Sequence, residues 1–151
     1  MWEKEDVKIA FQEFINENQT RLKDSVNGMM KAEYIDCNPK LRSITLRFHA
    51  LPWEANRSGL LHGGIMAAML DHVCNLTVSY HLGHWAPTLS MNIEYIRPAH
   101  IDDVILATAE IISAGKRILR INARLQDANS SKLIASCSAS FFNKEADVSE
   151  G

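Results

Sequence analysis

Asp71 is a single carboxylate in apolar surroundings, and it points more directly to chemistry than any other residue of this sequence. It follows an unbroken apolar run at residues 65–70, and two glycines, Gly63 and Gly64, precede that run. A carboxylate removed from water needs a hydrogen-bond donor, a ligand or a catalytic task. Glycines at a helix start leave backbone N–H groups open to a polarised carbonyl oxygen. An acid that activates water and amides that hold a carbonyl oxygen are the parts of a hydrolase site.

The spacing of these groups on a helix predicts a site made by two chains. Asp71 lies seven residues after Gly64 on the same stripe, but the helical rise separates the two residues by roughly 10 Å. An attacking water must lie about 3 to 3.5 Å from the carbon whose oxygen the amides hold. Because one carbonyl cannot meet both groups of one chain, we expect two antiparallel helices in a two-fold homodimer with shared sites.

Three kinds of pattern predict the elements that position these residues. The segment after Gly63 is apolar nearly all round, which predicts a buried central helix that ends near residues 81–83, before Pro87. An amphipathic helix near the N-terminus should cover the domain without entering its core; its apolar face is Val7, Ala10, Phe11, Phe14 and Ile15. Alternation predicts strands at residues 30–34, 44–48, 89–95, 105–111, 119–125 and 133–141.

Short turns at residues 114–116 and 127–130 make the last three predicted strands an antiparallel meander with one apolar face. The central helix is apolar enough to cover that face. The predicted fold class is therefore α+β, a curved antiparallel β-sheet wrapped around a long central helix. We expect an N-terminal helix and link at residues 1–28 that pack on the domain, the domain itself at residues 29–143, and a loose tail at residues 144–151.

Composition excludes several classes of function. The chain has 151 residues, enough for one domain, and a formal net charge of −2 that disfavours a nucleic-acid surface. The N-terminus lacks the pattern of a secretory signal, and the uncharged residues 72–93 carry too many polar groups for a membrane span. Three cysteines without C-x-x-C spacing suit a reducing compartment. We therefore expect a cytoplasmic protein without nucleic-acid or membrane partners.

The run N-R-S-G-L-L-H-G-G-I-M-A-A-M-L-D, followed by T-L-S-M-N-I-E-Y-I-R-P-A, resembles the hotdog-fold acyl-CoA thioesterases in the phenylacetyl-CoA thioesterase-like branch. The motif of that family is an Asn, five intervening residues, His-Gly-Gly, and an acid nine residues after the His. Asn56, His62, Gly63, Gly64 and Asp71 match this spacing. The resemblance extends from about residue 30 to residue 143, and it implies the hotdog fold and hydrolysis of a thioester.

The resemblance also implies roles for single residues. Asp71 would act as general base on water or as the attacking carboxylate, and both mechanisms stay open. The Gly63 backbone N–H would polarise the thioester carbonyl. Asn56 would position the water or the thioester, and Thr88 would bond the water or Asp71. His62 would brace the loop rather than transfer protons, and His62 and Gly64 would both contribute to substrate binding.

Basic residues at strand ends are candidates for binding the phosphates of coenzyme A, above all Arg97 and Arg117. For Arg120 and Arg124, a solvated strand face explains the charges equally well. Relatives often have a small residue where this chain has Cys74 and Asn75, which leaves the shape of the acyl pocket open.

The implied reaction needs no cofactor; coenzyme A enters only as part of the acyl-CoA substrate. A zinc site at His72, His81 and His84 is disfavoured because no acid or thiol completes a ligand set. The resemblance also leads us to expect a homotetramer. Two other functions compete: hydration or dehydration of acyl thioesters, which needs a catalytic His paired with an acid, and a non-catalytic acyl-CoA binding or sensor module. Turnover that depends on Asp71 separates hydrolysis from binding.

Overall fold

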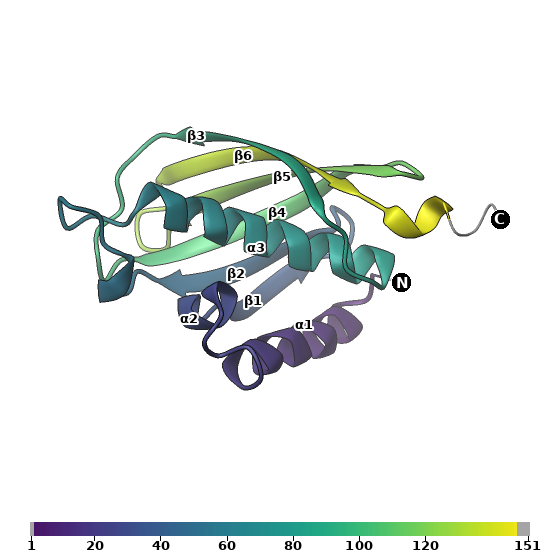
Figure 1. The fold of residues 1–151 in the computed structure, drawn as a ribbon, viewed down its shortest axis with the longest axis horizontal. Coiled ribbons are helices and arrows are strands. Elements are labelled where there is room, and N and C mark those ends of the chain that lie inside the picture. Colours follow the sequence, from purple (N-terminus) through teal and green to yellow (C-terminus); the bar gives the residue numbers. More distant parts are fainter. Residues whose placement is uncertain (1, 148–151) are drawn as a thin grey trace.

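The computed structural model describes residues 2–147, in which a six-stranded antiparallel sheet curves around one long helix, α3 (Figure 1). The strand order is β1-β2-β4-β5-β6-β3. The elements in chain order are α1 (Lys4–Gln19), α2 (Val26–Met30), β1 (Glu33–Asn38), β2 (Ser43–His49), the 3-10 helix η1 (Pro52–Glu54), α3 (Gly63–Leu82), β3 (Thr88–Tyr95), β4 (Val104–Ala114), β5 (Ile118–Asp127), β6 (Leu133–Phe142) and the 3-10 helix η2 (Lys144–Asp147). The predicted α+β architecture is confirmed.

Helix α3 begins and ends where its flanking residues predict. His62 is the N-cap, and Gly83 ends the helix at φ 79°, a left-handed conformation that glycine adopts without strain. The residues of α3 that are buried are Met66, Met69, Leu70, His72, Val73, Cys74, Leu76, Thr77, Val78 and Ser79. A single chain therefore covers most of the helix surface.

One stripe of α3 stays open in the single chain. It consists of Gly64, Ala68, Asp71 and Asn75, which follow one another at helical spacing and are exposed or half-buried. We call these four residues the uncovered stripe. The only ionisable side chain of the stripe is that of Asp71.

The sheet turns alternate residues toward α3, as the sequence predicts. In β5, Leu119, Ile121 and Leu125 are buried, whereas Arg120 and Arg124 on the other face are exposed. Strands β4, β5 and β6 pair in sequence as the predicted meander. The inner face of this meander and the buried side of α3 form the core.

Strand β3 is an open edge of the sheet. It pairs with β6, and within residues 2–147 no further strand lies beside it. Two of its large side chains, Leu89 and Tyr95, are 55% and 54% exposed. Long edge strands with exposed apolar side chains are templates for pairing with another chain.

The N-terminal region differs from the prediction in two respects. The helix at residues 4–19 does enter the core, because Val7 and Phe11 are fully buried. The first strand begins at Glu33, since Met30 ends helix α2 and Lys31 takes a left-handed conformation at φ 53° that interrupts an extended chain. Both outcomes depend on contacts with distant segments, which local patterning does not register.

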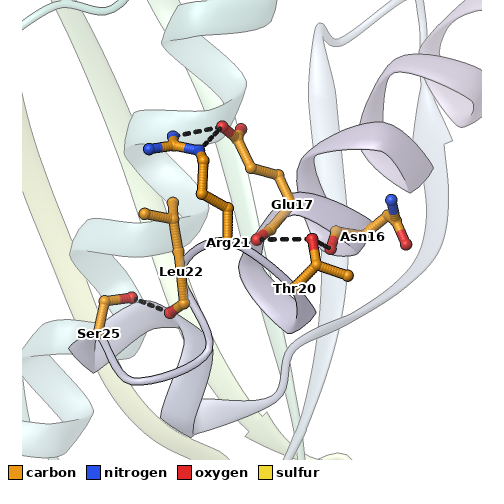
Figure 2. A network of polar contacts seen from close by, with 6 residues as sticks. All are labelled: Asn16, Glu17, Thr20, Arg21, Leu22 and Ser25. Carbon is orange, nitrogen blue, oxygen red and sulfur yellow. Dashed lines mark hydrogen bonds and ion pairs between the residues drawn. The ribbon is translucent and has the colours of Figure 1, made fainter.

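The link between α1 and α2 is a compact turn. Figure 2 shows Arg21 paired with Glu17 and the Ser25 hydroxyl donating to the Leu22 carbonyl oxygen. Ser25 also caps α2, because its Oγ accepts from the Gly28 N–H at 3.1 Å. A Cβ at Gly28 would collide with the Leu22 carbonyl oxygen, so glycine is required there.

The predicted loose tail at residues 144–151 falls partly outside the described residues. Lys144–Asp147 forms η2, and residues 148–151 lie outside the described part of the chain. The division into residues 1–28, 29–143 and 144–151 stays a prediction. Over residues 2–147, none of the helices combines the length and the apolar character needed to cross a lipid bilayer.

We predict that acid weakens the fold through His72. Burial lowers the pKa of His72 from 6.5 to about 4, and its Nε2 accepts from Asn18 Nδ2 at 3.2 Å. The unfolded chain takes up this proton below pH 6.5, whereas the folded chain takes it up only near pH 4. The contribution of His72 to the free energy of unfolding should therefore fall by about 2 kcal/mol between pH 7.5 and pH 5.

Chemical denaturation of wild type and His72→Gln at both pH values tests this expectation. The variant keeps an acceptor for Asn18 but does not titrate, so its stability should fall less. An equal fall in both proteins would contradict the role of His72.

Candidate active site

Asp71 meets a hydroxyl donor from the strand that follows its helix. Thr88, the first residue of β3, donates from Oγ1 to Asp71 Oδ1 at 2.8 Å. The side chain of Asp71 is half-buried on the uncovered stripe. The predicted contact between Thr88 and Asp71 is present, and it leaves the other carboxylate oxygen available.

A β-bulge turns Thr88 toward α3. Thr88 lies opposite the buried Phe141, but Ser90 already lies opposite Ser140, so Leu89 is an extra residue in β3. If Leu89 instead took part in regular alternation, Thr88 would lie on the outer face with Ser90. Sequence alternation alone gives no sign of this bulge.

Three of the first four backbone amides of α3 have hydrogen-bond acceptors within the helix start. The Gly64 N–H donates to His62 Nδ1 at 2.8 Å, and the N–H groups of Ile65 and Met66 donate to the His62 carbonyl oxygen at 3.0 Å. Within residues 2–147, the Gly63 N–H has no hydrogen-bond acceptor. The His62 ring thus caps the start of α3, and among residues 2–147 the Gly63 amide stays free.

The contribution of Gly64 to substrate binding stays a prediction, and the structure limits what its amide can supply. Its amide is already occupied by the capping imidazole of His62, so Gly64 does not offer a free N–H at the helix start. Position alone does not distinguish two adjacent glycines, because the difference arises from the side chain of the residue before them.

Asn56 shapes the loop that leads to α3. Its Oδ1 accepts from the N–H groups of Ser58 and Leu60 at 2.9 and 3.0 Å, and Gly59 takes a φ of 77° in the same turn. In the described residues the Asn56 Nδ2 has no hydrogen-bond partner. The side chain therefore has a structural role on its oxygen and free donors on its nitrogen.

Tyr95 lies at the candidate site, although the sequence alone predicts no role for it. Its hydroxyl donates to the Gly63 carbonyl oxygen at 2.8 Å, which joins the end of β3 to the start of α3. Tyr95 also lines a cavity of about 280 Å³ with Asn56, Met66 and Arg97. The Y-x-R-P-A run was the available signal, since Tyr95 ends an alternating strand immediately before this loop.

Arg97 and Arg117 lie at opposite ends of the sheet within one chain. Arg97 follows the Tyr95 end of β3 and donates to the Leu133 carbonyl oxygen at 3.1 Å. Arg117 lies in the turn between β4 and β5. The first residue of β5 pairs with the end of β6, and the end of β6 pairs with Thr88, so Arg117 is at the Thr88 end of the sheet. The eight residues of β3 alone span more than about 20 Å. One chain does not bring both guanidinium groups to one ligand.

The acid and the free amide are also apart within one chain. Gly63 and Asp71 lie eight residues apart on α3, so the helical rise separates them by about 12 Å. The single chain holds both parts of the predicted site but does not assemble them around one carbonyl carbon.

Two other groups of candidates have structural partners. A hydrogen bond with Cys137 and burial raise the pKa of Cys74, which keeps this thiol protonated and a poor nucleophile. His72, His81 and His84 have separate partners, namely Asn18, Trp2 and Glu145. Over the part of the chain that the structure describes, no group of three His, Cys, Asp or Glu side chains could hold a metal ion.

Comparison with known proteins identifies the family. The Thioesterase superfamily model matches residues 58–134. Acyl-coenzyme A thioesterase 13 from Mus musculus is 33% identical over 83 residues, 54% of this chain and 59% of its own length. The human protein of that name is 31% identical over the same shares. The chain thus spans about 59% of the length of the curated relatives it matches.

Solved structures show the same fold. Zebra fish thioesterase superfamily member 2 superposes with a TM-score of 0.75 at 24% identity, over 85% of this chain and 94% of that one. A putative thioesterase from Ralstonia eutropha, related to phenylacetic acid degradation, has a TM-score of 0.71 at 24% identity over 78% and 89%. This chain therefore belongs to the thioesterase superfamily, and its sheet wrapped around α3 is the hotdog fold that the resemblance predicts.

Proposed function

We propose that this protein is an acyl-CoA thioesterase of the phenylacetyl-CoA thioesterase-like branch, which hydrolyses a thioester to a carboxylic acid and coenzyme A. One observation carries the proposal: Asp71 lies on the uncovered stripe of α3 and accepts a hydrogen bond from Thr88, while the first amide of the same helix, that of Gly63, is free in the described residues. These are a positioned acid and an oxyanion donor.

The two parts meet in a two-fold homodimer formed along β3. Pairing this edge strand with its copy would run the two β3 strands antiparallel and set the two α3 helices antiparallel beneath them. The uncovered stripe of each helix would be covered, and Gly63 of one subunit would approach Asp71 of the other. In this two-fold dimer, Arg97 of one subunit and Arg117 of the other would lie at the same end of the joint sheet.

In the proposed reaction, Asp71 removes a proton from water, and the resulting hydroxide attacks the thioester carbon. Negative charge develops on the carbonyl oxygen, where the partner subunit's Gly63 N–H and the positive end of its helix stabilise it. The C–S bond then breaks, and the coenzyme A thiolate takes up a proton. Direct attack by the Asp71 carboxylate would give an anhydride that water cleaves to the same products.

Residues around the cavity next to Gly63 have supporting roles in the proposal. The free Nδ2 of Asn56 is placed to orient water or the thioester, since its oxygen is occupied within the loop. Arg97 lines that cavity and has further N–H groups for a phosphate of coenzyme A. Arg117 would come from the other subunit.

The names of the relatives agree with this substrate class. The curated relatives are named acyl-coenzyme A thioesterase 13, and a Streptococcus mutans protein of the same fold was solved bound to acetyl-CoA, at 18% identity and a TM-score of 0.67 over 74% of this chain and 86% of that one. The reaction uses no metal or separate cofactor. A homotetramer and a cytoplasmic location complete the proposal; the three free, buried cysteines suit a reducing compartment.

We predict that Asp71→Asn lowers kcat by about 10³-fold for every acyl-CoA that wild type hydrolyses, because the amide cannot accept the proton of water. Thiol release from a panel of acyl-CoAs measures this loss. The matched control is Asp36→Asn, which removes an exposed carboxylate of β1 at the opposite edge of the sheet. Turnover by Asp71→Asn at the wild-type rate would refute the role of Asp71. Binding of acyl-CoA by wild type without thiol release would favour a binding module.

We predict that two inactive variants restore activity when they share a dimer. Gly63→Pro removes the free N–H, yet it suits the fold: Gly63 is the first helical residue, and His62 already has the extended conformation that precedes proline, at φ −64° and ψ 134°. In a mixed dimer of Gly63→Pro and Asp71→Asn, one of the two sites has both wild-type groups. The isolated mixed dimers should therefore have about half of wild-type activity.

Co-expression with two affinity tags isolates the mixed dimers for this measurement. Gly63→Ala is the control and should stay active, since it keeps the N–H and its Cβ would lie 3.6 Å from the Tyr95 ring, an ordinary contact. Mixed dimers without activity would show that the acid and the amide do not come from different subunits.

A further inference from the structure

Asn75 lies one helical turn after Asp71 on the uncovered stripe and ties α3 to the segment that leads into β3. Its Nδ2 donates to the Ala86 carbonyl oxygen at 3.0 Å. Two residues later, the Thr88 hydroxyl donates to Asp71 at 2.8 Å. The two hydrogen bonds therefore attach residues 86–88 to α3 at both ends, at Asn75 and at Asp71.

The link between the two bonds is short and stiff. Two residues span at most about 7 Å, and the ring of Pro87 fixes its φ near −65°. Proline also restricts the residue before it, here Ala86, to extended conformations. The Pro87 carbonyl oxygen accepts from the Phe142 N–H at 3.0 Å, which attaches the link to β6. A displacement of Ala86 is therefore passed on to Thr88.

Other contacts of this segment attach it to other elements. The Trp85 ring packs against Phe14 of α1 with centroids 5.7 Å apart, and His84 Nε2 lies 3.4 Å from a Glu145 oxygen in η2. The Asn75 bond, by contrast, fixes the segment to the helix that carries Asp71. It therefore sets the position of the Thr88 hydroxyl relative to the carboxylate.

We propose that Asn75 is a positioning residue for thioester hydrolysis: by holding the Ala86 carbonyl it places the Thr88 hydroxyl on Asp71 and so orients the carboxylate. This inference rests on the proposed function. Asn75 acts through Ala86 and Thr88, not on the reacting atoms, so its loss should slow the chemical step without weakening substrate binding.

The test begins with Asn75→Leu, which keeps the branching of the side chain at Cγ but has no hydrogen-bond donor. We expect kcat to fall about tenfold while KM changes by less than about twofold. The matched control is Asn38→Ala, which also removes an asparagine bonded to turn backbone, at the β1–β2 turn on the opposite edge of the sheet. That variant should keep wild-type kcat and KM.

A double-mutant cycle with Thr88→Val separates positioning from a general structural effect. If Asn75 acts through the Thr88 hydroxyl, Asn75→Leu should lower kcat by less than about twofold once that hydroxyl is gone. An equal loss of kcat in both backgrounds, an unchanged kcat, or a change in KM alone would overturn the proposal. If thermal unfolding shows that Asn75→Leu does not fold, the same cycle with Asn75→Ala decides.

The outcomes for the activity and for Asn75 are distinct. Wild-type hydrolysis that Asp71→Asn abolishes, together with an additive cycle, overturns only the role of Asn75. Failure of wild type to release thiol from any acyl-CoA overturns the proposed function, and the role of Asn75 falls with it.

Discussion

Helix α3 must be shielded from water on nearly every side, and the rest of the domain is arranged to meet that requirement. The curved sheet covers most of it, and α1 contributes Val7 and Phe11 to the same core. The stripe that one chain leaves open contains Asp71 and adjoins the open edge of β3. The proposed association of two chains would meet both the physical need to cover this stripe and the chemical need to bring an amide to the acid.

Much of the fold was predictable because its elements differ in hydrophobic period. The all-round apolar segment of α3, the Gly83 stop and the alternating strands of the meander leave strong local signals. The errors fall in the first 35 residues. There, the start of β1 depends on the left-handed Lys31, and the burial of Phe11 depends on rings from distant elements, including Tyr34 and Tyr80. No window of neighbouring residues contains that information.

The sequence was enough to predict which residues belong to the candidate site, but not which of their groups are hydrogen-bonded to one another. The motif spacing led to Asp71 and to its contact with Thr88, which the structure contains. It did not show that the His62 ring occupies the Gly64 amide, because this depends on the direction of one side chain. It also gave Tyr95 no role, since the bond to the Gly63 carbonyl oxygen joins residues 32 positions apart.

Strand β3 contacts both ends of the reactive part of α3, through Thr88 at the acid and Tyr95 at the glycines. The two residues can share one face only because Leu89 is additional to the regular pairing with β6. Insertions next to Leu89 should therefore be far less tolerated than substitutions. One further residue inserted here and paired regularly with β6 would leave the buried core in place and turn the threonine outward, whereas loss of Leu89 would keep Thr88 opposite Phe141. Among divergent descendants of this sequence, the length of this short segment, more than its composition, would separate active proteins from inactive ones.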